Sequence, residues 1–268
     1  MSPGVVPTRV FPGERRSDGS SCPVNALPIP SEGLSPEIWQ ALGLTFRLAG
    51  LVTVLLLVLA VPLARWLTVS RRRWIPVVEA IVGLPVVLPP TVLGFYLLSL
   101  FAPDTPLGRF WFHVTGDTLA FSFEGLVLGS LIYSLPYAVQ PLAAAFRSIP
   151  PEYLEAARSV GARPWSVFWR VTLPLSRRGL LVAAMLSFAH TVGEFGVVVM
   201  LGGSIPGRTR VASIALYDEV QRLDYGTAHR LALVLLAFSF AILVPMAWLQ
   251  RRNRLGLGGI PERGQGVG

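Results

Sequence analysis

Lysine is absent from this 268-residue chain, and cysteine occurs once, at Cys22. A phosphate-binding loop ends in Gly-Lys-Ser or Gly-Lys-Thr, so the chain cannot form one and any ATP hydrolysis must come from another subunit. One cysteine excludes an intramolecular disulfide and a thiolate metal site, and the three scattered histidines do not supply a metal site instead. Ser-His-Asp spacing is also missing, so we predict no catalytic centre and no cofactor bound by this chain.

Charge is scarce as well. Only 14% of the residues are charged and 52% are hydrophobic, with a mean hydropathy of +0.57, which predicts a polytopic membrane protein. All 23 basic residues are arginine and the formal net charge is +8, a balance that can indicate nucleic-acid binding. Arginines that gather in alternate loops instead orient a membrane protein in its bilayer, so we predict no nucleic-acid partner.

Apolar runs that are long enough to cross a bilayer occur five times. The predicted transmembrane helices are about 38–69, 75–101, 125–146, 180–201 and 231–249. The first has favourable start chemistry, with Ser35 as N-cap and Pro36 at the first helical position. Residues 1–34 are rich in Pro, Gly and Ser and lack the apolar core of a signal peptide, so they are predicted to be a disordered tail. Residues 251–268 form a second, short tail.

The second predicted span is interrupted by prolines. Pro85, Pro89 and Pro90 remove backbone donors from it, and two glycines loosen it further. An interrupted helix in lipid must be shielded by protein or water. Residues 83–94 therefore either line a pathway through the membrane or form a tight turn at a helix junction.

Polar side chains recur at helical spacing in the third and fourth spans. The third carries Tyr133, Ser134, Tyr137 and Gln140, and the fourth carries Ser187, His190, Thr191 and Glu194. An acidic side chain in a membrane helix costs on the order of 2 to 3 kcal/mol, so Glu194 needs a partner or a cavity. Packing between helices and a place in a gate or pathway would both meet that need.

The arginines are divided unequally between two sets of loops. Fourteen of the 23 lie within 65–73, 147–178 and 251–263, and nine lie elsewhere. The positive-inside rule assigns the richer set to the cytoplasm. The segment 151–174 and the C-terminus are thus predicted to be cytoplasmic, and the N-terminus is predicted to lie outside.

The segment 151–174 is a polar interruption that also has a helical pattern. We predict an amphipathic helix, a Gly-Ala turn at 161–162 and a second short helix from Pro164 to Arg170. The segment contains Glu155-Ala156-Ala157, then Gly161 after three residues, then Val171 and Leu173-Pro174. This spacing resembles the EAA loop of permease subunits in binding-protein-dependent ABC importers.

In that family the segment is the cytoplasmic coupling helix, which sits in a cleft of an ATPase subunit. The resemblance implies an all-α, polytopic helical membrane protein with five transmembrane helices and a cytoplasmic coupling-helix loop, in the MetI-like type I ABC importer permease fold. Residues 35–250 would form the permease domain. The implied ATPase-coupling residues are Glu152, Leu154, Glu155, Ala156, Ala157, Gly161, Ala162, Pro164, Leu173 and Pro174.

The resemblance also implies partners and a location. The chain would form a homodimer in the bacterial inner membrane, with two cytoplasmic ATP-binding cassette subunits that use ATP and Mg²⁺. An extracytoplasmic oxyanion-binding protein would deliver the substrate.

Residues 84–98 and 193–220 narrow the resemblance to molybdate permeases, with sulfate permeases as near relatives. The implied translocation path or gate consists of Pro89, Pro90, Tyr137, Thr191, Gly193, Glu194, Phe195 and Gly196. The implied docking segment for the binding protein includes Ser204, Pro206, Gly207, Arg208 and Arg210. Its two arginines would attract a dianion or an acidic protein surface, or else lie solvated near lipid headgroups.

We therefore expect a permease subunit that carries molybdate or tungstate. Sulfate transport stays open as an alternative, because both anions are tetrahedral and doubly charged. A secondary transporter that uses Glu79, His190 and Glu194 as proton relay groups is a third hypothesis, and the complete loop spacing argues against it.

Overall fold

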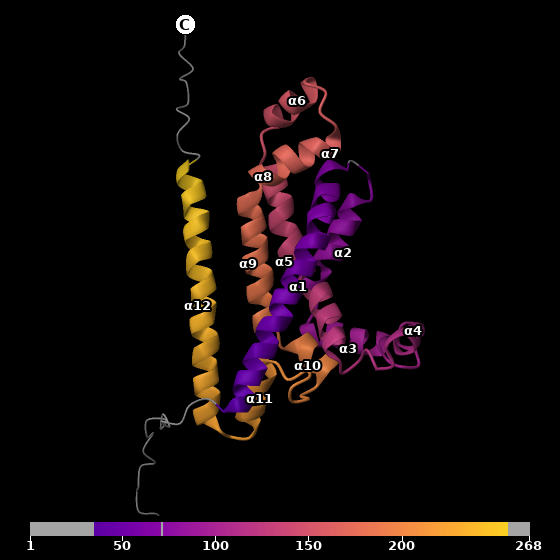
Figure 1. Ribbon diagram of the computed structural model, residues 1–268, viewed down its shortest axis with the longest axis vertical. Helices are drawn as coiled ribbons and strands as arrows, with labels where there is room; N and C mark the ends of the chain where they lie inside the picture. Colours follow the sequence, from indigo (N-terminus) through magenta and orange to yellow (C-terminus); the bar gives the residue numbers. More distant parts are fainter. Residues whose placement is uncertain (1–34, 71, 257–268) are drawn as a thin grey trace, which may run out of the picture.

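The computed structural model describes residues 35–70 and 72–256, and these ranges fold into helices joined by short connections (Figure 1). The predicted all-α class is confirmed. The predicted N-terminal tail with Cys22, and residues 257–268 of the predicted C-terminal tail, lie outside the described residues.

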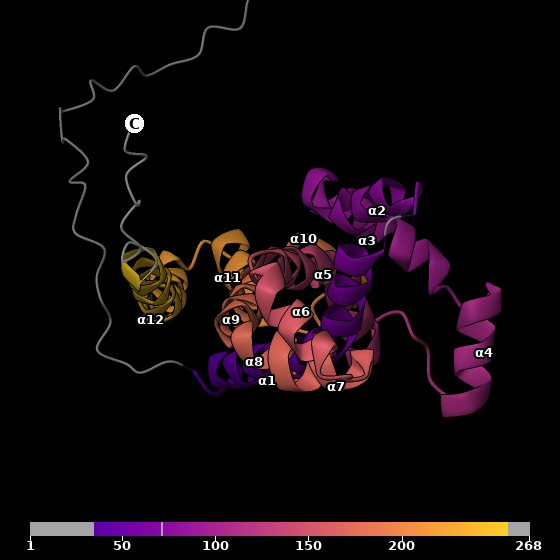
Figure 2. The ribbon, with the colours of Figure 1, turned by 90° about the horizontal axis from the view of Figure 1, so that it is seen from above.

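Three helices form the centre of the bundle: α1 (Pro36–Val69), α5 (Phe123–Arg147) and α9 (Arg177–Gly193). They lie side by side when the molecule is seen from above (Figure 2). Their contacts bury aliphatic side chains such as Val52 and Leu56 of α1 and Leu126 and Leu142 of α5. At about 1.5 Å per residue, the 34 residues of α1 exceed the ~30 Å of a bilayer core.

The second predicted span is not one helix. It consists of α2 (Ile75–Val87) and α3 (Pro90–Leu100), which are bent by 109° relative to each other. Leu88 and Pro89 both have extended ψ angles, because each precedes a proline and the α region is disfavoured there. Residues 83–94 therefore contain a helix junction, which was one of the two interpretations. Pro90 and Thr91 of this junction also line a cavity.

A helix also occupies the region after this span, which the sequence indicated only as a hydrophilic loop. α4 (Pro106–Thr115) begins where the hydroxyl of Thr105 accepts the N–H of Gly108 at 3.0 Å, and it ends at Gly116 with φ of 75°. Those are ordinary cap residues for a helix start and a helix end. Figure 1 shows α4 projecting sideways from the bundle.

The polar segment after α5 folds into a continuous series of short helices. They are α6 (Pro151–Ser159), α7 (Pro164–Val167), the π-helical turn η1 (Phe168–Thr172) and α8 (Leu173–Leu175). In η1, the N–H of Leu173 donates to the carbonyl of Phe168, and Pro174 has no N–H to continue the ladder. The stretch Pro164–Leu175 meets α9 at an angle of 69°.

The predicted fourth span, 180–201, is also divided. α9 ends at Gly193, Glu194 is extended, and the chain resumes as α10 (Gly196–Gly202). α11 (Ala212–Gln221) then follows the implied docking segment, in a stretch where no helix was predicted.

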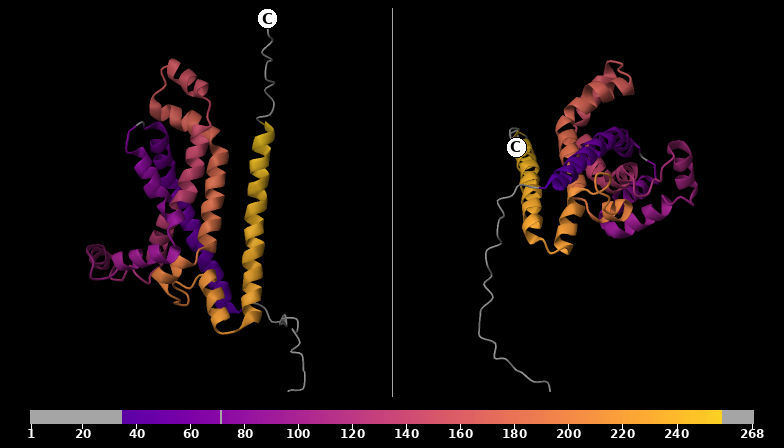
Figure 3. Two further views of the ribbon diagram at one scale, coloured as in Figure 1. Left: turned by 180° about the vertical axis from the view of Figure 1, so that it is seen from behind. Right: turned by 60° about the horizontal axis from the view of Figure 1, so that its bottom comes forward.

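α12 (Tyr225–Gly256) is the last helix and extends beyond the predicted end of its span at residue 249. The backbone N–H of Thr227 donates to the carboxylate of Asp224, which precedes the helix, and this bond lowers the pKa of Asp224. Only 6% of the most apolar 18-residue stretch of α12 is buried. Figure 3 shows the helix at the side of the bundle, which it contacts through the Phe238 ring, packed against Phe46 of α1 and Phe188 of α9.

By length and composition, the described helices provide between three and five membrane crossings. Among the described residues, α1, α5 and Tyr225–Trp248 of α12 are each long and apolar enough to span a bilayer, and two bent pairs raise the number to five if each is one span. The start of α1 and the end of α12 lie at opposite ends of the bundle, and α6 lies at the same end as the end of α12 (Figure 1).

Candidate functional site

Helix α6 opens the loop segment, which we define as residues 151–175, and it buries none of its residues. α6 ends in a Schellman motif: the N–H of Ala162 donates to the carbonyl of Ala157 at 3.2 Å, and the N–H of Gly161 donates to Arg158 at 2.9 Å. Gly161 has φ of +78°, a region that glycine enters at the least cost. The motif spacing from Ala157 to Gly161 is therefore the spacing of a helix C-terminus.

The ten predicted coupling residues all lie in or between the helices of the loop segment. Six of these ten residues are exposed, namely Glu152, Glu155, Ala156, Gly161, Pro164 and Pro174. The other four are half-buried, namely Leu154, Ala157, Ala162 and Leu173. Neither Glu152 nor Glu155 forms an ion pair with a described residue. α6 thus exposes two carboxylates without an ion-pair partner among the described residues, together with the small side chain of Ala156.

Arg65 of α1 attaches the loop segment to the bundle. Its Nη2 donates to the carbonyl of Pro164 at 3.1 Å, and its guanidinium lies 4.2 Å from the centre of the Phe168 ring. Phe168 is itself buried and packs edge-on against Phe146 of α5. Moving α7 and η1 would therefore change their contacts with α1 and α5.

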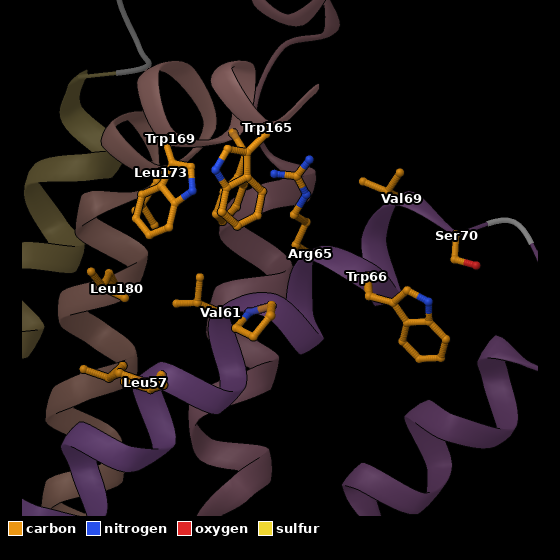
Figure 4. A pocket seen from close by; sticks show the side chains of 13 residues that line it. Leu57, Val61, Arg65, Trp66, Val69, Ser70, Trp165, Trp169, Leu173 and Leu180 are labelled. Carbon is orange, nitrogen blue, oxygen red and sulfur yellow. The ribbon is translucent and has the colours of Figure 1, made fainter. Parts of the chain in front are cut away.

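Beside this attachment lies an apolar groove of about 680 Å³ (Figure 4). Trp165 and Trp169 of the loop segment form one side of it, and Val61 and Trp66 of α1 form another. Among the described residues in its lining, Arg65 is the one charged side chain. The groove suits acyl chains or apolar side chains and offers an oxyanion little to bind.

The breaks in the second and fourth predicted spans lie against each other. A Cβ atom added to Gly196 would come within 2.5 Å of Pro90 Cβ and 3.3 Å of the backbone nitrogen of Thr91. A Cβ on Gly94 of α3 would meet Met200 of α10 at 2.8 Å. Glycine at 94 and 196 therefore lets α3 and α10 approach as closely as they do.

A cavity of about 490 Å³ opens at this double break. Five of the eight predicted path residues line it: Pro90, Gly193, Glu194, Phe195 and Gly196. Its other lining residues include Thr91, Tyr133 and His190, which were not assigned to the path. Tyr133 and His190 belong to the polar side chains that recur at helical spacing in the third and fourth spans, and this spacing is the sequence signal that could have placed them at the cavity.

Two further predicted path residues, Tyr137 and Thr191, lie behind the cavity wall. The Tyr137 ring stacks on the His190 ring with centroids 3.8 Å apart, and the Ser134 hydroxyl lies 2.9 Å from His190 Nδ1. Thr191 is buried and donates to the carbonyl of Ser187 at 2.9 Å. The last, Pro89, precedes α3 as its N-cap residue. The contacts of Tyr137 and Ser134 hold the imidazole of His190 in place at the cavity.

Glu194 is almost fully buried, with 4% exposure. Both of its carboxylate oxygens lack a hydrogen-bond partner among the described residues, and so do the hydroxyls of Ser130 and Ser187. Its backbone carbonyl accepts the Ser213 hydroxyl of α11 at 2.6 Å, which satisfies one group freed by the break. An unsatisfied buried carboxylate is costly, so Glu194 gains most from any rearrangement that gives it partners.

The predicted docking segment is ordered by its own contacts. Ser204 donates to Asp218 at 2.6 Å, Gly207 turns the chain with φ of +72°, and Arg208 forms an ion pair with Asp117. Ser204, Pro206, Gly207 and Arg208 remain exposed.

Arg210 does not fit the role predicted for it. Its side chain is only 6% exposed and pairs with Glu37 of α1 at 3.3 Å and with Asp218 and Glu219 of α11 at 3.0 and 3.1 Å. The idea that its charge is offered to an incoming anion or protein is wrong, because three carboxylates already surround it. Arg210 instead joins α11 to the start of α1.

Among the described residues, no group of three or more His, Cys, Asp and Glu side chains is arranged to hold a metal ion. Taken together, the fold and these features define a helical membrane permease, with an exposed loop helix at one end and a cavity at a double helix break. The chain belongs to the family of binding-protein-dependent transport system inner membrane components, which matches it over residues 56–255.

Several curated relatives resemble most of the chain. The molybdenum transport system permease protein ModB of Azotobacter vinelandii is 47% identical over 224 residues, which cover 84% of this chain and 99% of that protein. The protein of the same name from Escherichia coli K12 is 34% identical and covers 82% and 96%. The sulfate transport system permease protein CysW of a Synechocystis species is 32% identical and covers 83% of each.

Solved structures share the fold. A bacterial ABC transporter that imports alginate matches with a TM-score of 0.67 at 20% identity, covering 81% of this chain and 80% of that one. The inward-facing MetNI methionine ABC transporter matches with a TM-score of 0.61 at 17% identity, covering 81% and 94%. The predicted MetI-like importer permease fold is confirmed.

Replacing Gly161 with valine should unwind the end of α6, whereas Gly161→Asn should preserve it, because asparagine tolerates the left-handed conformation and a β-branched residue does not. Nothing lies within 4 Å of a Cβ at this position, so crowding does not confuse the comparison. Amide hydrogen exchange over residues 157–162 measures the effect. Equal protection in the two variants would contradict the role given to the Schellman motif.

Arg210→Gln should lower the free energy of unfolding by about 3 kcal/mol, because it removes the buried cation that Asp218 and Glu219 share and leaves Glu219 with only the exposed Arg222 as a partner. Arg222→Gln is the matched control: Arg222 pairs with the same carboxylate at 3.3 Å but its side chain is 63% exposed, so its loss should cost at most about 1 kcal/mol. Thermal unfolding in detergent would compare them. A smaller loss for Arg210 than for Arg222 would refute the structural assignment.

Proposed function

We propose that the chain is the membrane permease subunit of an ATP-driven importer, and that it forms the translocation path for molybdate or tungstate delivered by a binding protein. The observation that carries this proposal is the 47% identity to a molybdenum permease along nearly the whole length of that relative. The importer fold and the cavity at the helix breaks are consistent with it.

Sulfate is the second candidate substrate. A sulfate permease is 32% identical over 83% of the chain. The molybdenum and sulfate relatives therefore differ in sequence identity but match a similar share of this chain. Both anions are tetrahedral dianions, and a path made of hydroxyls and backbone donors would accept either. Selection between them is expected to rest mainly on the binding protein.

The loop segment is the proposed contact with the ATPase. Two ATP-binding cassette subunits would bind ATP and Mg²⁺, and each would receive one exposed α6 helix in a cleft. The carboxylates of Glu152 and Glu155 and the small side chains of Ala156 and Gly161 would meet that cleft. The opposite end of the bundle, at Ser204, Pro206, Gly207 and Arg208, would receive the extracytoplasmic binding protein.

Orientation in the bacterial inner membrane follows from the arginines. Arg147 ends α5 and Arg177 begins α9, so both flank the loop segment, and the excess of arginines in this set of loops supports a cytoplasmic position for α6 and for the C-terminus. The N-terminus would then lie outside.

Two copies would form the complete path. A single chain leaves large apolar side chains exposed beside the break, among them Val87 at 83% and Phe95 at 55% exposure. The cavity at the break is not enclosed by the single chain. A twofold-related copy would cover such a surface and close the path, as closed symmetric dimers commonly do.

The mechanism that we propose transmits motion along bonded elements. Closure of the ATPase pair on ATP would displace α6, and the chain from α7 through α8 would pass the displacement directly to α9. Arg65 would pass it to α1 through its bond to Pro164. The result would be a repacking at the break, where Glu194 gains or loses partners and the cavity opens to one side or the other.

At the cavity, the oxyanion would meet hydrogen-bond donors rather than a fixed positive charge. Thr91, Tyr133 and His190 supply such donors in its wall, which also contains the Glu194 carboxyl group, so Glu194 must be neutral or paired while the dianion passes. Weak neutral donors allow the anion to leave as well as to enter.

Reconstitution of the permease with its ATPase and binding protein tests the proposal. Molybdate-loaded binding protein should stimulate ATP hydrolysis and uptake, and Glu155→Lys should abolish the stimulation, because it reverses the charge that α6 presents. Glu124→Lys, at the start of α5, is a control of equal charge change near the other end of the bundle and should keep substantial coupling. Stimulation by sulfate alone would assign the second substrate, and uptake driven by a pH gradient without ATP would overturn the importer proposal.

A further inference from the structure

Three arginines border a cavity of about 210 Å³ between α6 and the bundle. Arg65 comes from α1, Arg147 from α5 and Arg158 from α6, so three separate elements each contribute one cation. Thr68 and Thr172 also line the cavity, and among the described residues no acidic side chain does. This cavity is separate from the one at the helix breaks and shares no residue with it.

The positive charge around this cavity is only partly balanced. Arg147 pairs with Glu79, whose side chain is 41% exposed. Arg65 bonds a neutral carbonyl, and Arg158 forms no ion pair with a described residue, although Glu155 lies one turn before it on α6. Like charges held near one another repel, so an anion placed among them gains attraction from each.

We propose that this cavity binds a tetrahedral oxyanion, either a free ion or the phosphate group of a lipid. Guanidinium groups donate in pairs to such oxygens, which makes arginine the side chain best suited to the task. The volume is several times the ~30 Å³ that a water molecule occupies in the liquid, so an oxyanion fits with part of its hydration.

Occupancy of the site would change how α6 is held. α6 contacts α7 and η1 and buries no side chain against the spans, so its position depends mainly on its two ends. An oxyanion bonded to Arg158 and Arg65 would tie the C-terminal turn of α6 to α1. If α6 transmits the motion of the ATPase, which rests on the proposed function, an oxyanion that accumulates on this side would slow further import.

Binding is tested on the full chain without ATPase or binding protein. Cys22→Ser removes the one native cysteine, and Ser159→Cys then carries a spin label at the exposed end of α6. In nanodiscs of neutral lipid, sulfate, molybdate or phosphate should each immobilise the label saturably, at an ionic strength held constant with chloride. Arg158→Gln should raise the half-saturating concentration about tenfold or more, since it removes charge-assisted hydrogen bonds.

Arg163→Gln is the matched control, because Arg163 is exposed, lies in the same segment and does not line the cavity. It should leave the half-saturating concentration unchanged. Immobilisation in anionic-lipid nanodiscs without added oxyanion, lost in Arg158→Gln, would support the site with a lipid headgroup as its source. An equal response to chloride, or an equal effect of the two substitutions, would overturn the proposal and leave the transport function untouched.

Discussion

A backbone N–H or C=O group inside a bilayer must find its partner within the protein, and the positions of the two helix breaks depend on that constraint. Both breaks occur at the same place, where Gly196 packs on Pro90 and Thr91. The Ser213 hydroxyl takes up the carbonyl of Glu194. Because each break is shielded mainly by the other, non-helical backbone is allowed there, and the same place holds a cavity instead of a tightly packed core.

The cavity is connected to α6, at the end of the bundle, through helices that follow one another in the chain. α9 leads upward from the break and joins the loop segment through Ser176, so a motion of α6 has a short route to Glu194. The π-helical turn at Phe168–Thr172 and the proline that follows it lie on this route. Arg65 adds a parallel route into α1, and the aromatic contact of Phe168 with Phe146 adds one into α5.

Patterns that are local in the chain were predictable from the sequence, and contacts between distant residues were not. Hydropathy indicated the spans, and the Ala157 to Gly161 spacing predicted the end of α6. The 109° bend was not predictable, because the prolines determine that a helix stops but not the direction of the next one. The role of Arg210 was not predictable because its burial depends on the packing of α11 against the start of α1, where Glu37, 173 residues away, joins Asp218 and Glu219 around it. Thr105 and Gly116 are ordinary cap residues, but no helix was predicted between the second and third spans, so α4 was not anticipated.

The central claim is that α6 carries the contact with the ATPase, at the cytoplasmic end of the bundle. Site-specific cross-linking in the assembled complex tests it most directly, with Cys22→Ser as the background. A cysteine at Ala156 on α6 should cross-link to the ATPase subunit with a yield that changes on adding ATP. A cysteine at Phe112, which is 50% exposed on α4 near the opposite end, should not. Cross-linking of the ATPase to Phe112→Cys and not to Ala156→Cys would contradict both the orientation and the role of the loop segment.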